Sequence, residues 1–152
     1  MYLKSIAVAL SAAAASAAAF AITANGQSSA PAPLKFTAKA ISGKPVDLGR
    51  KGVSIGDEFL ERGILKNEAG KAGGFEMVTQ LVAGSPRHGH EHTTFVLELS
   101  GGQLVVTGGH ATTSRFTMPL VGGTGSYRGA RGTMTIAPGA GETERLTVSL
   151  DG

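Results

Sequence analysis

VGGTGSYRGARGTMTI is the sequence of Val121–Ile136, and this stretch decides the fold. Glycine adopts positive φ without a steric penalty, so the run Gly122–Gly125 permits a sharp turn. After the turn, small and apolar residues alternate with polar ones, which is typical of a strand with one buried face. Ala130 and Gly132 are small enough for the tapered interior of a small barrel. The stretch therefore predicts a turn followed by a barrel strand.

The same glycines resemble a nucleotide-binding loop, but the context excludes that interpretation. A dinucleotide fingerprint needs a helix directly after the glycines and an acidic residue about 20 positions further on. Here a strand pattern follows, so no nucleotide site is expected.

Short apolar runs broken by Gly, Pro, Asn and Ser continue through the rest of the chain, with no helical period outside the N-terminal segment. About eight strands at short intervals predict an all-β protein. Closure of eight antiparallel strands into a barrel removes exposed sheet edges. The interior of such a barrel can hold one small ligand. The expected strands are 34–40, 55–66, 75–83, 93–99, 103–109, 115–121, 130–137 and 143–150.

The turn resembles the GGTG-x-[YF]-x-x-[AV]-x-G signature of dirigent proteins and allene oxide cyclase-like barrels. The resemblance extends back through Gly56–Phe59 and Gly73–Phe75 and covers roughly Leu34 to Leu150. It implies a small eight-stranded antiparallel barrel of the calycin type.

The first residues are typical of an export signal. Lys4 precedes an apolar run from Ile6 to Ala21, and Ala19–Ala21 fits an A-x-A cleavage site. We expect a signal peptide at 1–24, a flexible linker at 25–33, one barrel domain at 34–152 and secretion to the periplasm or the extracellular space. The run is short and alanine-rich for a membrane span, so an uncleaved anchor is the lesser alternative.

The amino-acid composition limits the classes of partner that this protein is expected to bind. The chain has no cysteine, so the domain must fold without disulfides, which about 120 residues can do. The formal net charge is +3, but the basic residues are scattered and tryptophan is absent. Nucleic-acid surfaces combine clustered Lys and Arg with stacking rings, so no nucleic-acid partner is expected.

The hairpin around Gly101-Gly102 sets which side chains face the interior. A two-residue turn at these glycines would place Leu99, Leu97 and Phe95 opposite Leu104, Val106 and Gly108, with Thr93 opposite His110. A three-residue turn would set His92 opposite His110 instead, but it pairs apolar with polar residues. A slip of one residue turns every side chain to the other face, so the apolar match favours the two-residue turn.

His88, His90 and His92 form the candidate metal site. Imidazole nitrogen binds zinc and copper, and alternate residues of a strand can share an ion. His88 and His92 lie about 13 Å apart on an extended strand, so at most two neighbours could hold one metal. An exposed polar hairpin end is the favoured interpretation, and no cofactor is expected.

His110 is the first catalytic candidate, because it should face the interior near the barrel mouth and can act as acid or base near neutral pH. Glu91 shares a face with Thr93 and Phe95, and Glu76 is predicted inward together with Val78 and Gln80. A carboxylate desolvated in such a pocket has its pKa raised, which tunes it as a base. Hydrogen bonding at the rim is the alternative role for all three.

The family resemblance implies further roles by spacing. His110 resembles the position of a pocket tyrosine of allene oxide cyclases, Glu76 that of a cysteine, and Glu91 that of a phenylalanine. The family's catalytic glutamate would fall near Phe36–Lys39, where this chain has no carboxylate. Allene oxide cyclase chemistry itself is therefore not expected.

Together these features predict a secreted barrel that binds a small hydrophobic molecule, as an isomerase or cyclase that uses His110 and a glutamate. A non-catalytic carrier barrel and a periplasmic metal-binding protein are the alternatives. The resemblance implies a trimer, since members of both families commonly form one, and Phe75, Met77 and Leu81 are predicted to form an outward apolar stripe. We therefore expect a homo-oligomer, with a trimer as the first choice, and no stable membrane anchor.

Overall fold

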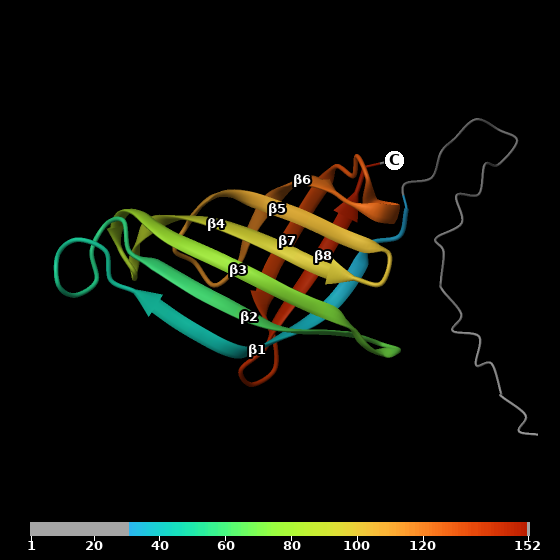
Figure 1. The fold of residues 1–152 in the computed structure, drawn as a ribbon, viewed down its shortest axis with the longest axis horizontal. Helices are drawn as coiled ribbons and strands as arrows, with labels where there is room; N and C mark the ends of the chain where they lie inside the picture. Colours follow the sequence, from blue (N-terminus) through green and yellow to red (C-terminus); the bar gives the residue numbers. More distant parts are fainter. Residues whose placement is uncertain (1–30, 152) are drawn as a thin grey trace, which may run out of the picture.

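Eight antiparallel strands close into one barrel in the computed structural model, which describes residues 31–151 (Figure 1). Each strand pairs with the next along the chain, and the last pairs with the first, so the predicted all-β barrel is confirmed. The strands are β1 (Leu34–Val46), β2 (Glu58–Asn67), β3 (Gly70–Ser85), β4 (His88–Leu99), β5 (Gly102–Ala111), β6 (Phe116–Gly123), β7 (Gly132–Pro138) and β8 (Glu144–Leu150), with the 3-10 turn η1 (Gly125–Tyr127) after β6. The predicted signal peptide and most of the predicted linker lie outside the described residues.

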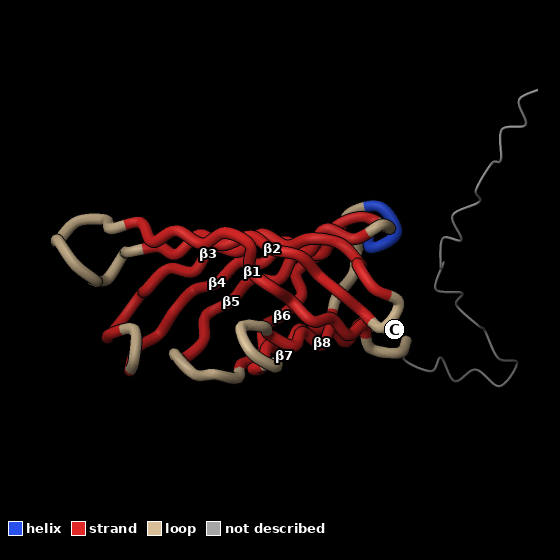
Figure 2. The backbone as a smooth tube through the Cα atoms, turned by 90° about the horizontal axis from the view of Figure 1, so that it is seen from below, coloured by secondary structure: helices blue, strands red, loops and turns tan. Residues whose placement is uncertain are grey.

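The up-and-down order gives the barrel two different ends (Figures 1 and 2). One end carries η1 and the β2–β3 and β4–β5 hairpins, and we call it the packed end. The other carries the β1–β2, β3–β4, β5–β6 and β7–β8 connections, and we call it the mouth. No helix in the described part of the chain is long and apolar enough to cross a membrane.

Alternation along the strands fills the packed end with apolar side chains. Phe95, Leu97, Leu104 and Val106 are fully buried on β4 and β5, and residues from the other six strands complete one continuous core. Burial of each large apolar side chain stabilises the fold by about 1.5–3 kcal/mol, so this end anchors the barrel.

The glycine-rich stretch closes the packed end. Thr124 Oγ1 accepts a 3.0 Å hydrogen bond from the Gln103 amide, and the Thr124 amide donates 2.9 Å back to the Gln103 carbonyl. The Ser126 amide donates 2.8 Å to the Gly101 carbonyl. Gly102 has φ +133°, and a Cβ there would overlap the Thr124 carbonyl oxygen. The motif thus docks η1 against the β4–β5 hairpin.

The predicted turn at Gly101-Gly102 is wrong by one residue. The two-residue turn is Ser100-Gly101, so Leu99 pairs with Gly102, Phe95 with Val106 and Glu91 with His110. Gly102 is required by its contact with Thr124 and not as a turn residue. The displacement changes each partner by two positions, so every side chain keeps its predicted face.

The predicted faces of β3 are also wrong. Phe75, Met77 and Leu81 lie on the inner face, where Phe75 and Leu81 are buried, while Glu76 lies exposed on the outer face. The larger apolar set faces the interior because it gains more from burial than a face carrying a carboxylate and an amide. The outward apolar stripe therefore does not exist, and the expected trimer loses the argument drawn from it.

Candidate functional site

Two hollows open at the mouth, where the inner face changes from large apolar residues to small and polar ones. Ala40 on β1 leaves space where the packed end has Phe36, while at Gly43 the ring of Phe59 occupies the place of a side chain. On β2, Phe59 and Glu61 are neighbours on the inner face, two positions apart in the sequence. Phe59 lines the first hollow and Glu61 lines the second. Small ligands bind in concave sites of this kind with apolar walls and a few polar groups, so the mouth is the candidate site.

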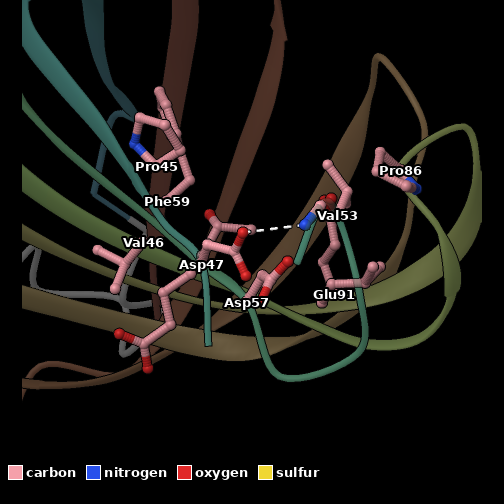
Figure 3. Close-up of a pocket in the computed structure, with 12 residues that line it drawn as sticks. Pro45, Val46, Asp47, Val53, Asp57, Phe59, Pro86 and Glu91 are labelled. Atoms are coloured by element: carbon pink, nitrogen blue, oxygen red, sulfur yellow. Dashed lines mark hydrogen bonds between the residues drawn. The ribbon is translucent and has the colours of Figure 1, made fainter. Parts of the chain in front are cut away.

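The first hollow, which we call the apolar hollow, has a volume of about 430 Å³. In Figure 3, Phe59 and Pro45 lie on one side of Asp47 and Asp57, with Val53 and Glu91 on the other. The full lining is Pro45, Val46, Asp47, Gly52, Val53, Asp57, Glu58, Phe59, Thr79, Leu81, Pro86 and Glu91. Its walls are mostly apolar, and its charged groups are all carboxylates.

The β1–β2 loop forms one wall of the apolar hollow, and Asp57 folds it. Asp57 Oδ1 accepts a hydrogen bond from the Leu48 amide and Oδ2 from the Ser54 amide, both at 2.7 Å. These bonds, with that of Leu48 the stronger, lower the pKa of Asp57. Asp47 Oδ2 accepts 2.9 Å from the Gly52 amide, the bond drawn in Figure 3. Because these carboxylates are occupied by backbone amides, their role is to shape the loop.

The second hollow, the carboxylate hollow, has a volume of about 420 Å³. Glu61 enters it from β2 and Glu144 from β8, while β1 lies between those strands. The full lining is Ala38, Ala40, Glu61, Phe75, Gly141, Glu142, Thr143 and Glu144. The site therefore combines two inward carboxylates with the edge of the aromatic core.

Both inward carboxylates hold their protons more tightly than usual. Burial raises the pKa of Glu61, and burial together with the negative charge of Glu61 raises the pKa of Glu144. Glu144 is exposed as a whole residue, but its carboxyl group, which titrates, lies within the crowded mouth. Two coupled carboxyl groups of this kind can share one proton and so offer an acid and a base together.

A chain of hydrogen bonds runs behind the apolar hollow. The Thr79 hydroxyl, which lines the hollow, lies 2.9 Å from the buried Thr93 hydroxyl, and Thr93 Oγ1 lies 2.9 Å from His110 Nε2. His110 Nδ1 donates 3.0 Å to the Ala111 carbonyl oxygen. A neutral imidazole that donates from Nδ1 must accept at Nε2, so Thr93 donates to His110. The chain connects the hollow to a histidine.

His110 also lies where the backbone pairing between β5 and β6 is missing. Strands β5 and β6 pair only from Leu104 to Val106, and Pro119 of β6 has no N–H to continue the ladder. The His110 ring stacks on Phe116 of β6, with centroids 3.7 Å apart and the planes 9° from parallel. The aromatic stack replaces the missing strand pairing at the mouth.

The sequence-predicted candidates separate into two groups. Glu91 lines the apolar hollow, and His110 lies on the same inner face opposite it. Glu76 was predicted inward, and this is wrong because it projects from the outer face.

The histidine cluster lies on the outer face. His88, His90 and His92 are exposed, and His92 Nε2 is hydrogen-bonded at 3.1 Å to Thr107 Oγ1. Within residues 31–151 no three His, Cys, Asp or Glu side chains lie close enough together to hold a metal ion. The cluster therefore lies at the mouth end but on the outer face, and none of its histidines lines either hollow.

Sequence reasoning missed Glu61 and Glu144. Each carried a signal, because Glu61 alternates with Phe59 and the buried Leu65, and Glu144 alternates with the buried Leu146 and Val148. Extending the buried face of each strand by one alternate position toward the mouth would have found both.

Fold and site together define a small all-β barrel with a ligand-sized opening at one end. Solved structures share this fold: the chain superposes on pyocyanin demethylase with a TM-score of 0.71 and 22% identity, covering 78% of this chain and 99% of that one. It matches the exo-specific intermolecular Diels-Alderase AbnU with a TM-score of 0.64 and 14% identity, covering 79% and 97%. It matches a pterocarpan synthase dirigent protein with a TM-score of 0.59 and 14% identity, covering 78% and 81%.

The resemblance to dirigent and allene oxide cyclase-like barrels is thus confirmed as a likeness of fold. No protein-family model and no curated protein matches the chain.

Proposed function

We propose that this protein binds a small hydrophobic molecule at the mouth of its barrel and moves a proton on it, as an isomerase or cyclase does. The observation that carries the proposal is the pair Glu61 and Glu144, two inward carboxyl groups with raised pKa values in one hollow. A general acid or base works best when its pKa lies near the working pH, and burial moves a glutamate in that direction.

The two carboxyl groups suit proton transfer because they can differ in protonation. When one is ionised, its charge favours the protonated form of the other. The ionised member can take a proton from a carbon or oxygen of the ligand, and the protonated member can return one at a second atom. The ligand then leaves with its atoms rearranged, and no oxidant is consumed.

The wall of the apolar hollow formed by Thr79 and Glu91 is suited to bind a polar atom of the ligand. The Thr79 hydroxyl is presented to the apolar hollow, and the contact with Thr93 and His110 fixes its orientation. Glu91 lines the same wall. A ligand with an apolar body held by Phe59 and Leu81 could therefore be oriented by a hydroxyl on one side and by the carboxylate pair on the other.

The neighbours by fold support the proposal by analogy. They include a demethylase, Diels-Alderases and a dirigent protein, so the barrel is one that has supported chemistry on small molecules. Export, inferred from residues 1–24, is a part of the proposal that rests on the sequence.

The test begins with native mass spectrometry of the protein purified from the organism that makes it, which should show a bound small organic molecule. That molecule is then incubated with the protein in D2O and followed by NMR. We expect deuterium exchange at one ligand position, slowed by about 10²–10⁴-fold in Glu61→Gln and Glu144→Gln.

Glu76→Gln is the matched control, because it removes the same charge from the outer face, and it should exchange at the wild-type rate. A bound ligand that never exchanges and is recovered unchanged would contradict catalysis and indicate a carrier barrel. Absence of any bound molecule, together with no binding of small hydrophobic probes, would contradict both functions.

A further inference from the structure

Charge is distributed unevenly over this molecule. The chain has 11 acidic residues against 14 lysines and arginines, yet seven of the acidic residues line the two hollows. No Lys or Arg in the described part of the chain lines either hollow. The seven are Asp47, Asp57, Glu58, Glu61, Glu91, Glu142 and Glu144. A chain with a net positive charge therefore has a mouth with a negative lining.

Internal structure accounts for some of these carboxylates. Asp47 and Asp57 accept backbone hydrogen bonds that fold the β1–β2 loop, and Glu58 lies 3.4 Å from the Gln80 amide nitrogen. Glu61 and Glu144 differ, because burial acts on both and the charge of Glu61 acts on Glu144, with no opposing hydrogen bond or cation within the described residues. The protein alone leaves the charge of this pair uncompensated.

The walls beside the pair are suited to a positively charged aromatic molecule. Phe75 lines the carboxylate hollow, and Phe59 lines the apolar hollow one inner-face position away from Glu61. The faces of aromatic rings attract cations, by about 0.5–2 kcal/mol depending on desolvation. Each hollow, at about 420–430 Å³, is within the usual range for small-ligand sites.

We infer that the ligand of the mouth is a hydrophobic cation, a molecule with an aromatic body and a positively charged nitrogen beside Glu61 and Glu144. This inference rests on the proposed function, since it names the class of molecule that the same site binds. Even when the pair shares one proton it retains one negative charge, which a cation would balance. An anionic ligand would meet carboxylates on both walls, so the same lining excludes it.

Three probes of similar shape and different charge test the inference. N-methylquinolinium is a cation, quinoline is neutral above pH 7, and quinoline-4-carboxylate is an anion. Titration calorimetry at pH 8 on the full-length protein should show the cation binding about 10-fold or more tighter than quinoline, which corresponds to about 1.4 kcal/mol. The anion should bind more weakly than both.

The variants locate the effect. The double variant Glu61→Gln/Glu144→Gln should bind the cation about 10-fold more weakly and bind quinoline as before, because only the charge changes. Glu76→Gln should retain the wild-type preference, and far-UV circular dichroism should confirm that all the variants are folded. Phe59→Ala should weaken the cation and the neutral probe together.

Each other outcome has a definite meaning. Quinoline binding as tightly as the cation, or a cation preference that survives the double variant, overturns the inference and leaves the proposed ligand site standing. Failure of all three probes to bind overturns both the inference and the mouth as a site for small aromatic ligands.

Discussion

The packed end and the mouth of this barrel use the same strands for opposite purposes. At the packed end, Phe95 and Leu97 are fully buried and surrounded by apolar neighbours. At the mouth, Glu91 continues the inner face of β4, as Glu61 continues that of β2 and Glu144 that of β8. Each of these strands thus carries buried apolar residues that stabilise the fold and, toward the mouth, a carboxylate that lines the candidate site.

The difference shows why the mouth can carry charge at all. Removing a carboxylate from water is costly, and a single uncompensated group can cancel much of what apolar burial provides. The packed end supplies that stability, and the interleaved η1 turn holds it closed. The mouth can then hold carboxyl groups in a partly dry setting, where their pKa values move in a useful direction.

The largest expected effect separates the ends by a matched pair of truncations. Phe95→Ala removes a fully buried ring and should cost about 3–5 kcal/mol of unfolding free energy, because the core cannot close over the cavity. Phe59→Ala removes a ring that is 38% exposed at the mouth and should cost about 1 kcal/mol. Urea unfolding followed by circular dichroism measures both, and equal losses would mean that the mouth is as structural as the core.

A smaller loss of stability is expected on removing the Thr93 hydroxyl, which contacts both Thr79 and His110. Thr93→Val keeps the shape but leaves His110 Nε2 and the Thr79 hydroxyl without their partner, at a cost of about 1–2 kcal/mol. Thr94→Val, which breaks the outer-face contact with Thr107, should cost about 0.5 kcal/mol because water can replace it.

Nitrogen NMR of the imidazole adds a second measurement for Thr93. It should show the Nδ1–H form of neutral His110 in the wild type, and a disturbed signal in Thr93→Val only. An unchanged signal would argue against the proposed chain of hydrogen bonds.

The smallest effect is a change in the pH dependence of stability. The folded protein holds the protons of Glu61 and Glu144 more tightly than the unfolded chain does, since their pKa values are raised. Stability should therefore fall as pH rises above the ordinary glutamate range, and level off above the raised pKa values.

The double variant Glu61→Gln/Glu144→Gln should remove that fall and raise the melting temperature at pH 7 by about 2 °C, an effect kept small by solvent screening. At pH 3 it should match the wild type. Calorimetric scans from pH 3 to pH 7 measure the melting temperatures of the wild type and the double variant. A variant less stable than the wild type at pH 7 would show that the pair stabilises the fold.

The sequence predicted the strands well because their information is local. Alternation of apolar and polar residues marks a half-buried strand within about six residues, and glycine marks the positions where a side chain would clash. A turn was expected at Gly122–Gly125 for this reason, and it begins at Thr124, since Gly122 and Gly123 still pair within β6. The inward face of His110 and Glu91 was predicted correctly.

The errors fall where two non-local contacts compete. The β4–β5 turn moved by one residue because Gly102 is used against Thr124, a residue from a different hairpin. Glu76 was predicted inside because it shares a face with Val78 and Gln80, whereas the burial of Phe75 against Phe95, with ring centroids 5.9 Å apart, decided the face.

By itself the sequence determined an eight-stranded all-β barrel, the glycine turn that closes it and the inward position of His110. Only the tertiary structure decided which carboxylates meet. Glu61 and Glu144 belong to strands far apart in the chain, and both come to border β1 only because β8 closes the barrel against it. Local alternation shows which side chains of a strand face the interior. Which residues of different strands lie close together depends on strand register and barrel closure, and these result from many weak contacts along the whole chain.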